Sequence, residues 1–482
     1  MIDFTSASLD FGMLAPEIAL LAAAFVILLT SSIRPVSRLA PVFALIGLVV
    51  SLALAIEQWG NQASGFFGMV TCDDYGTAFK VIFAVISIIT LFIAHRYLIV
   101  KGINRPEFYA LLLFSTMGMM VMANSTDLVV MFLGLEIMSV PLYVMAAFAR
   151  RSLISNEAGL KYFVMGAFAS GFLLMGITLI FGASETTDLR RLVADFNYIV
   201  ASNPELLYTG SALILIGFGF KIAAVPFHTW VPDVYQGAPT PVTAFFSAGP
   251  KAAGFAVMLR IFLFGLEQID ILSTTFWVLA VLTMTVGNVL ALRQENVKRM
   301  LAYSSIAHAG YILIALAVGG SEAISAAMFY LAGYAMFNLG GFAVVTLLET
   351  RSGCRSDFGE LSGLSRAHPY LAGVLALFMF ALSGFPPTVG FFGKFYVFSA
   401  AVKAGFIWLA IIGVMNSFIS VYYYLRIVKV AYLDRSESAF IPVTYSTSIV
   451  LALIITVLGT MGLGLWPQQF LKLSQQALFA FL

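Results

Sequence analysis

The chain consists almost entirely of apolar runs, each long enough to cross a bilayer, which follow one another from near its start to its end. A membrane-spanning helix needs about 20 predominantly apolar residues. Unpaired backbone groups are costly in lipid, so spanning segments of this length form helices. We therefore predict an all-α integral membrane protein of about 14 transmembrane helices. The predicted spans are 13–33, 39–57, 75–98, 106–123, 126–149, 157–182, 206–231, 238–265, 272–292, 299–318, 322–348, 369–399, 404–433 and 444–466.

Composition supports a membrane location and excludes several other classes. Hydrophobic residues make up 61% of the 482 residues and charged residues 10%, whereas a soluble chain carries about 25% charged residues. The net charge of +2 and the lack of a long basic cluster argue against nucleic-acid binding. No basic segment precedes the span 13–33, so we expect a retained helix there and not a cleaved signal.

The distribution of basic residues predicts the orientation. With the N-terminus outside, sixteen Lys and Arg residues fall in inside loops, against four in outside loops. Cytoplasmic loops carry the excess of Lys and Arg, so both termini are expected to face outward. Cys72 then lies outside and Cys354 inside, and the two cannot form a disulfide.

Two predicted spans contain helix breakers. The seventh has the sequence GFGFKIAAVPFHTWVPD, and the twelfth has ALSGFPPTVGFFGKFYVF with Pro386–Pro387. Proline removes a backbone donor and clashes with the preceding turn. Because the freed backbone groups need protein or water partners, a broken helix in a membrane lies beside a polar cavity.

Broken spans at matching places in two halves are typical of transporters with inverted repeats. Glu136 and Lys221 are 85 positions apart, and His308 and Lys394 are 86 apart. We therefore expect spans four to eight to repeat as spans nine to thirteen, in opposite orientation. The predicted division is a three-helix segment 1–105, a first five-helix repeat 106–265, a second repeat 272–433 and a C-terminal helix 444–482.

Ionisable residues within the apolar runs are the candidate functional residues. Each charged group at mid-helix costs roughly 2.5–3.5 kcal/mol on insertion scales. Several such groups are therefore unexpected unless they have a function. The candidates are Glu136, Lys161, Lys221, Lys251, His308 and Lys394.

Lysine suits a proton relay, because the pKa of a buried lysine falls on desolvation and rises beside a carboxylate. Arginine stays protonated and cannot serve in this way. We expect Glu136 to lie beside Lys221 and to control its charge. Arg260 and Lys80 lie nearer span ends and are expected to be interfacial anchors.

Structural alternatives stay open for several candidates. Lys161 can form a local i,i+4 pair with Glu157. Glu136 and Lys221 can form a purely structural ion pair, and His308 can be an ordinary core histidine. Aromatic runs such as Tyr422–Tyr424 fit packing or an interfacial belt better than a ligand site.

No cofactor is expected in this chain. Two cysteines cannot supply the four ligands that an iron–sulfur cluster usually takes. The four histidines do not form the paired sets of a bis-histidine haem protein, and no GxGxxG turn is present.

Three long motifs resemble a known family. FKIAAVPFHTWVPDVYQGAPTPVTAFFSAGPK, NVKRMLAYSSIAHAGYIL and LSGFPPTVGFFGKFYVF are similar to signature stretches of the antiporter-like membrane subunits. That family includes three membrane subunits of respiratory complex I and the large subunits of multisubunit sodium/proton antiporters. The resemblance covers spans four to thirteen, about two thirds of the chain.

Within the family the sequence is most similar to the N-type subunit of complex I. Lys394 stands where the M-type subunit is expected to have glutamate, and the long lateral helix of the L-type subunit is not expected. EAGLKYFVMGAFASGF also looks like the N-type sixth span. The resemblance implies that Glu136 and Lys221 form the input pair, that Lys251 is the central relay and that Lys394 is the outlet.

The resemblance also implies a setting. The chain is expected to be a non-redox, proton-translocating subunit of an NADH:quinone oxidoreductase in the bacterial inner membrane. M-type and small membrane subunits would be its partners, and flavin, iron–sulfur clusters and quinone would be held by other subunits. The rival functions are a sodium/proton antiporter subunit and a purely structural subunit. Sodium needs oxygen ligands, whereas the mid-span set is mostly lysine.

Overall fold

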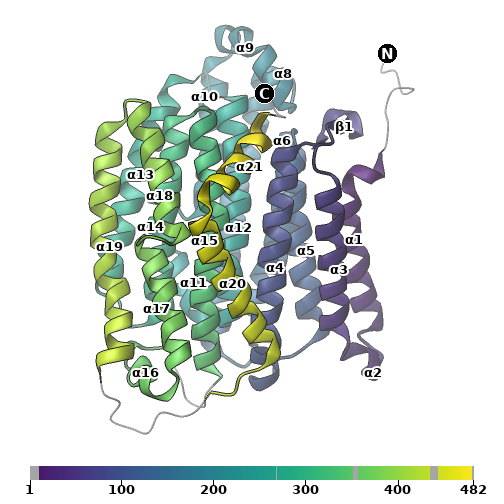
Figure 1. The fold of residues 1–482 in the computed structure, drawn as a ribbon. Coiled ribbons are helices and arrows are strands. Elements are labelled where there is room, and N and C mark those ends of the chain that lie inside the picture. Colours follow the sequence, from purple (N-terminus) through teal and green to yellow (C-terminus); the bar gives the residue numbers. More distant parts are fainter. Residues whose placement is uncertain (1–9, 267–268, 351–355, 435–442, 480–482) are drawn as a thin grey trace.

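The computed structural model describes residues 10–266, 269–350, 356–434 and 443–479. They form a bundle of long, roughly parallel and antiparallel helices (Figure 1). Helix α1 begins and α21 ends at the end of the bundle that carries α8 and α9, opposite α2 and α16 (Figure 1). Cys354, used above in the disulfide argument, lies outside the described residues.

The chain opens with three long helices and a small hairpin. The elements of this segment are η2 (Phe11–Leu14), α1 (Ala15–Thr30), α2 (Arg34–Ser37), α3 (Ala40–Glu57), β1 (Ala63–Gly65), η3 (Phe66–Gly68), β2 (Val70–Cys72) and α4 (Asp74–Val100). Strands β1 and β2 pair antiparallel and are the only strands among the described residues. The hairpin was not predicted, because it is too short to show a periodic pattern.

Two series of helices follow. The first is α5 (Pro106–Asn124), α6 (Leu128–Ala146), α7 (Leu153–Ser184), α8 (Leu189–Ala194), α9 (Phe196–Ser202), α10 (Pro204–Ile222), α11 (Val231–Gly237), α12 (Thr240–Arg260) and η4 (Ile261–Gly265). The second is α13 (Asp270–Ala291), α14 (Val297–Val318), α15 (Gly320–Glu349), η5 (Phe358–Leu361), α16 (Leu364–Ala367), α17 (Pro369–Ser383), α18 (Val389–Lys403) and α19 (Ile407–Leu433). Helices α20 (Thr447–Leu465) and α21 (Pro467–Phe479) complete the chain.

The prediction of a helical membrane protein is confirmed. Among the described residues, thirteen helices are long and apolar enough to cross a membrane. They coincide with thirteen of the predicted spans, and the remaining one, 369–399, is divided between α17 and α18, which have 15 residues each. The count of fourteen spans stays a prediction for that reason.

A helix ends within each of the two spans predicted to be broken: α10 is followed by α11 from Val231, and α17 is followed by α18 from Val389. Helix α10 ends at Ile222 and is followed by Ala223 in the left-handed conformation, with φ of 64°. Helix α17 ends at Ser383, and Gly384 adopts the same conformation with φ of 89°. Freed backbone groups find partners in the protein: Trp230 Nε1 donates to the carbonyl of Phe220 at 3.1 Å. The breaks are thus satisfied from inside the bundle, as lipid requires.

The nearly equal spacings used to predict the repeats end at lysines that occupy different positions relative to the helix breaks. Lys221 lies in the last turn of α10, before the first break, whereas Lys394 lies in α18, after the second break. The two lysines thus lie on different sides of their breaks. The division into repeats is not decided by them and stays a prediction.

A different correspondence links the two series. Asp127 caps α6 by accepting from the backbone N–H groups of Val129 and Val130, and Asn296 caps α14 by accepting from Arg299. Each cap residue also forms an isolated antiparallel bridge, Asp127 with Asp188 and Asn296 with Asp357. The partner in each case follows the third and longest helix of its series, α7 or α15. The two bridges lie beside α8 and near α16, which are at opposite ends of the bundle (Figure 1).

The centre of the bundle is formed by α12, α14 and α15. The most apolar stretch of each is 100%, 94% and 94% buried, against 33% for α1, α3 and α7. Polar side chains on the central helices therefore cannot reach lipid headgroups or bulk water by extending. They must be satisfied by other groups inside the bundle.

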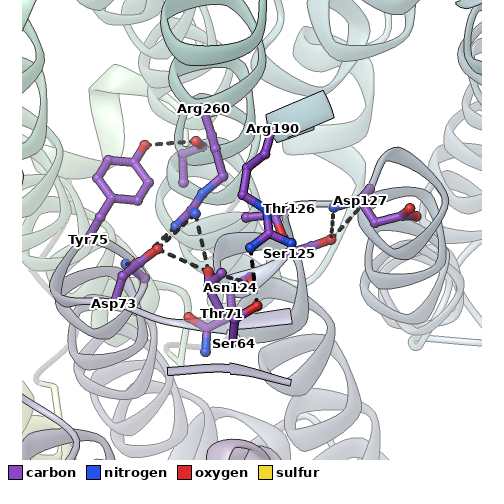
Figure 2. Close-up of polar contacts among 12 residues, drawn as sticks. Ser64, Thr71, Asp73, Tyr75, Asn124, Ser125, Thr126, Asp127, Arg190 and Arg260 are labelled. Carbon is purple, nitrogen blue, oxygen red and sulfur yellow. Dashed lines mark hydrogen bonds and ion pairs between the residues drawn. The ribbon is translucent and has the colours of Figure 1, made fainter. Parts of the chain in front are cut away.

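Lys80 and Arg260, expected to be interfacial anchors, are instead fully buried, and that prediction was wrong. Lys80 lies 2.9 Å from Glu17, and Arg260 donates to both carboxylate oxygens of Asp73 at 2.9 and 3.0 Å. Figure 2 shows Arg260 pointing to Asp73 and Thr71, beside the ring of Tyr75. Helix ends can lie deep within a wide bundle, and a sequence does not show this.

The Arg260–Asp73 pair joins the end of α12 to the start of α4. Burial alone would raise the pKa of Asp73, but the charge and hydrogen bonds of Arg260 outweigh it and hold the pKa below its ordinary value. The carboxylate is also the N-cap of α4, where it accepts from the N–H of Gly76 at 2.6 Å. One side chain therefore both starts a helix and fixes the N-terminal segment to the central helix.

We expect Arg260→Met to destabilise the folded chain by about 3–5 kcal/mol, because it leaves the Asp73 carboxylate buried without its charge partner. The measurement is the thermal stability of the purified complex and the amount of this subunit assembled in it. The double variant Arg260→Met/Asp73→Leu should recover part of the loss. Arg260→Met with wild-type stability would contradict a structural role for the pair.

Candidate functional site

The six candidate residues lie on six different helices, and four of them are deeply buried. Relative exposure is 5% for Lys221, 1% for Lys251, 1% for His308 and 4% for Lys394. Glu136 is only partly buried, on α6. The structure therefore separates the candidates into a buried set and two residues, Glu136 and Lys161, nearer the outside of the bundle.

Lys161 belongs to a surface network and not to the buried set. Its side chain is 41% exposed and pairs with Glu157 at 2.8 Å and Asp233 at 2.9 Å. Asp233 also pairs with Arg299 at 2.7 Å. Burial would raise the pKa of Asp233, but the hydrogen bonds from Lys161 and Arg299 hold it below its ordinary value. The local pair with Glu157 is the alternative that the structure supports.

Glu136 and Lys221 form no direct ion pair, so the predicted contact was wrong. Glu136 Oε1 accepts a hydrogen bond from Ser170 Oγ at 2.5 Å. Lys221 Nζ donates to Ser139 Oγ at 2.8 Å and to the Tyr143 hydroxyl at 3.2 Å. Electrostatic interaction between Glu136 and Lys221 persists through space. Each of the two charged groups is therefore hydrogen-bonded to hydroxyl groups and not to the other charged group.

Aromatic rings surround the Lys221 ammonium. Nζ lies 5.3 Å from the ring centroid of Tyr143 and 5.9 Å from that of Tyr162. Tyr162 in turn stacks on Trp230 with centroids 4.5 Å apart. Gly166 permits this arrangement, since a Cβ there would collide with the Tyr143 hydroxyl. Cation–π contact partly offsets the loss of hydration of a buried ammonium group.

Lys251, on α12, bonds to the neighbouring central helix α14. Its Nζ donates to the backbone carbonyl of Ser305 at 2.6 Å and also contacts the Ser305 hydroxyl. Of the ion pairs among the described residues, none includes Lys251. The lysine is therefore held by neutral oxygen atoms only.

His308 is bonded at both ring nitrogens. Nδ1 lies 2.7 Å from the Tyr330 hydroxyl, and Nε2 lies 3.1 Å from the Tyr424 hydroxyl. Tyr424 also hydrogen-bonds to Ser304, the neighbour of the Ser305 that contacts Lys251. A neutral imidazole donates from one nitrogen and accepts at the other. His308 can therefore accept a proton at one ring nitrogen and release a proton from the other.

Lys394 uses the carbonyl groups that the second helix break sets free. Its Nζ donates to the carbonyls of Leu382 and Ser383 at 3.3 and 3.0 Å, and to Ser417 Oγ at 2.8 Å. It also lies 5.0 Å from the ring centroid of Tyr311. The exposed carbonyls at a helix C-terminus favour a cation. The break in the helix thus creates the binding place for this lysine.

The buried residues form two clusters. The first joins Lys221 to Ser139 and Tyr143; the second contains Lys251, His308 and Lys394 with the hydroxyls around them. Both Lys251 and Lys394 are close enough to His308 to act on it electrostatically. Tyr162 and Trp230 lie on the side of the first cluster that faces α12. The hydrogen bonds described here do not connect the two clusters to each other.

Several functional neighbours were missed in the sequence. Tyr424 was assigned to packing with the rest of the run Tyr422–Tyr424, but it is fully buried and bonds to His308. Ser304 and Ser305 stand in the motif with His308, at helical spacings of four and three, which is the signal that was available. Tyr330 carried no such signal. Among the described residues, no group of three or more His, Cys, Asp or Glu side chains could hold a metal ion.

Comparison with known proteins places this arrangement in a family. Residues 125–420 match the family described as NADH:quinone oxidoreductase/Mrp antiporter, TM. NADH-quinone oxidoreductase subunit N of Trichlorobacter lovleyi is 45% identical over 98% of this chain and 97% of its own length. The chain belongs to the NADH-quinone oxidoreductase subunit N family. The N-type resemblance predicted from the sequence is confirmed.

Other members of the subunit N family and solved structures agree. Subunit N 1 of Solibacter usitatus is 43% identical over 90% of each chain. A chain of respiratory complex I from Thermus thermophilus with bound Aureothin has a TM-score of 0.80 and 32% identity, covering 95% of this chain and 99% of its own. A chain of the Mrp complex from Dietzia has a TM-score of 0.84 and 23% identity over 97% of each chain, which shows a common fold.

Lys161→Gln is expected to leave the complex assembled with more than half of its coupled NADH oxidation, because exposed ion pairs contribute only about 0–1 kcal/mol. Lys221→Gln removes a buried titratable group and should reduce the coupled rate by at least about tenfold. Both rates are measured in membranes with matched enzyme content. Equal impairment of the two variants would show that Lys161 is as important for coupled turnover as Lys221.

Proposed function

We propose that this chain is the antiporter-like subunit N of a proton-translocating NADH-quinone oxidoreductase. Its part in the enzyme is to conduct protons, with no redox step of its own. Its relatives bear the name of that enzyme subunit over nearly the whole chain. Buried titratable residues on central helices supply the groups that proton conduction needs.

The observation that carries the proposal is the nature of the lysine partners. Lys221, Lys251 and Lys394 are buried, and each is bonded by hydroxyl or carbonyl oxygens and by no carboxylate. A hydroxyl accepts from an ammonium group and donates to a neutral amine, so it satisfies both protonation states. A carboxylate only accepts and therefore holds the lysine charged. These three lysines are arranged to gain and lose a proton.

Lys80 provides the contrast within the same chain. It is as deeply buried as the relay lysines, but it lies between the Glu17 carboxylate and the Gln58 amide oxygen, at 2.9 and 3.1 Å. This ion pair joins α4 to α1. Deep burial alone therefore does not identify a relay lysine in this chain. The hydrogen-bonding partners of the lysine distinguish the two roles.

The proposed relay uses the residues in the following roles. Glu136 changes its charge on the outer side of the bundle and acts through space on Lys221. Ser170 is hydrogen-bonded to Glu136, and Tyr143 to Lys221. Lys251 is the central relay. Its proton passes along the hydroxyls of Ser305, Ser304 and Tyr424 to His308, whose electrostatic neighbours are Lys251 and Lys394. Lys394 is the outlet residue, and Lys161 has no part in the transfer.

We also propose that 106–265 and 272–433 are inverted repeats. The bridges of Asp127 with Asp188 and of Asn296 with Asp357 support this, because each connects the second helix of a series to the segment after the third. Their places at opposite ends of the bundle fit opposite orientations (Figure 1). The segment 1–105 and the C-terminal helix 444–482 lie outside the repeats.

The cellular setting follows from the proposed function. We place the chain in the bacterial inner membrane with both termini on the periplasmic side, as the excess of basic residues in the opposite loops supports. M-type and small membrane subunits of the complex are the partners. Flavin, iron–sulfur clusters and quinone belong to other subunits. Sodium/proton exchange is disfavoured because the buried site presents lysine amines, which do not ligate a cation.

Substitutions of Lys394 distinguish a proton relay from a structural cation. We expect Lys394→Ala and Lys394→Met to reduce coupled NADH oxidation and proton translocation strongly. Lys394→Arg should retain only part of both, because arginine keeps the charge but does not release its proton near neutral pH. The measurements use membranes with matched enzyme content, with Lys403→Arg, an exposed lysine paired with Glu322, as the matched control. Arginine equal to lysine in both assays would show that Lys394 is not a proton carrier.

A further inference from the structure

Helix α13 supplies none of the six candidate residues, but it places one amide side chain deep inside the bundle. The most apolar stretch of this helix is only 39% buried, whereas Asn288 is completely buried. An asparagine amide has two N–H donors and a carbonyl oxygen, and leaving any of them without a partner is costly when the group is buried. The partners of Asn288 therefore show what this side chain holds in place.

Both the nitrogen and the oxygen of this amide are bonded to the two helices that pack beside α13. Asn288 Nδ2 donates to the Tyr311 hydroxyl on α14 at 3.0 Å and to Asn416 Oδ1 on α19 at 3.3 Å. Asn288 Oδ1 accepts from the Tyr423 hydroxyl, also on α19, at 2.8 Å. We term these four residues the Asn288 network. One amide group thus connects α13, α14 and α19.

A second amide fixes the orientation of the first. Asn416 Nδ2 donates to Thr285 Oγ1 on α13 at 3.2 Å and to the carbonyl of Ile412 at 3.1 Å. The oxygen of Asn416 is therefore the atom that faces Asn288. If the Asn288 amide turned by half a rotation, its oxygen would face this oxygen, and two acceptors would oppose each other. Each amide thus specifies the orientation of the other.

The Asn288 network lies directly against Lys394. The ring centroid of Tyr311 is 5.0 Å from Lys394 Nζ. Ser417, the residue after Asn416, accepts from the same Nζ at 2.8 Å. The other contacts of the ammonium described above are the carbonyls at the end of α17. Asn288 thus holds the aromatic ring in place and, through Asn416, the part of α19 that provides the serine hydroxyl.

The same network packs beside His308. The ring centroids of Tyr423 and Tyr424 are 4.4 Å apart, and the Tyr424 hydroxyl lies 3.1 Å from His308 Nε2. The ring centroids of His308 and Tyr311 are 5.7 Å apart. Asn288 therefore supports the surroundings of two candidate residues, although its own hydrogen bonds go to neither of them.

We propose that Asn288 is a positioning residue for proton exchange at Lys394, acting through Tyr311 and Asn416. The amide takes up and releases no proton itself. It keeps the ring and the serine hydroxyl in the geometry in which the lysine exchanges its proton, which requires hydrogen-bond distances of about 2.6–3.2 Å. A misplacement of about 1 Å caused by a remote substitution can lower a rate about 100-fold. This inference rests on the proposed function, since it adds a positioning residue to the proposed outlet.

The network is tested by a substitution that nearly keeps the shape of the side chain and removes its polarity. We expect Asn288→Leu to lower proton translocation and coupled NADH oxidation at least about fivefold, because misplaced partners slow proton exchange. Both are measured in membranes with matched content of assembled enzyme. The matched control is Asn124→Leu on α5. Asn124 is 1% exposed, and its amide has no hydrogen-bond partner among the described residues. The control should keep more than half of the wild-type rate.

Two further readouts separate positioning from a general loss of stability. Tyr311→Phe keeps the ring and breaks the same hydrogen bond, so it should also lower the rate, and it provides the test should Asn288→Leu assemble poorly. The double variant Asn288→Leu/Tyr311→Phe should lose no more than Asn288→Leu alone, whereas independent damage would multiply the two losses. The ratio of rates in H2O and D2O should rise in Asn288→Leu, since proton exchange becomes rate-limiting, and stay unchanged in Asn124→Leu.

The outcomes for the positioning role and for the proposed function are distinguishable. Wild-type rates and isotope ratios in Asn288→Leu, or losses that multiply in the double variant, would overturn the positioning role. Loss of function in Lys394→Met in the same membranes would then leave the proposed function intact. Wild-type behaviour of Lys394→Met would instead reject the proposed function.

Discussion

The structure depends on how positive charges are satisfied where neither water nor lipid can satisfy them. The central helices α12, α14 and α15 are almost completely buried, so a lysine on one of them has only protein groups as partners. A buried ion pair and a set of neutral hydroxyls are two different solutions. The first fixes the charge, and the second leaves it able to change. This chain contains both arrangements. Lysines in ion pairs have a structural role, and lysines bonded to neutral oxygen atoms belong to the proposed relay.

The breaks in two helices follow from the same constraint. The carbonyls released at the end of α17 would be costly in an apolar bundle, and the ammonium of Lys394 accounts for two of them. At the first break, the indole of Trp230 satisfies the carbonyl of Phe220 while its ring stacks on Tyr162 beside Lys221. Each break therefore lies close to a buried lysine. Lys221 precedes the first break, and Lys394 follows the second.

Sequence alone predicted the membrane class, the positions of thirteen spans and the lysines that prove to be buried. These features depend on local composition, which a single chain displays. The sequence does not show which helices face each other. The wrong predictions all concern contacts or burial that depend on this packing. Glu136 was paired with Lys221, although each of them is hydrogen-bonded to a serine hydroxyl instead. Lys161 was placed in the buried set, although it is half exposed.

The proposed account makes Lys251 the central relay residue, from which the hydroxyls of Ser305, Ser304 and Tyr424 lead to His308. The most direct measurement is the number of protons translocated per NADH oxidised by the purified enzyme in sealed proteoliposomes, with Lys251→Met compared with wild type. The account predicts a lower ratio or a loss of coupled turnover in Lys251→Met, with the complex fully assembled. An unchanged ratio at an unchanged rate would contradict it, because no proton would then need to reside on the central lysine.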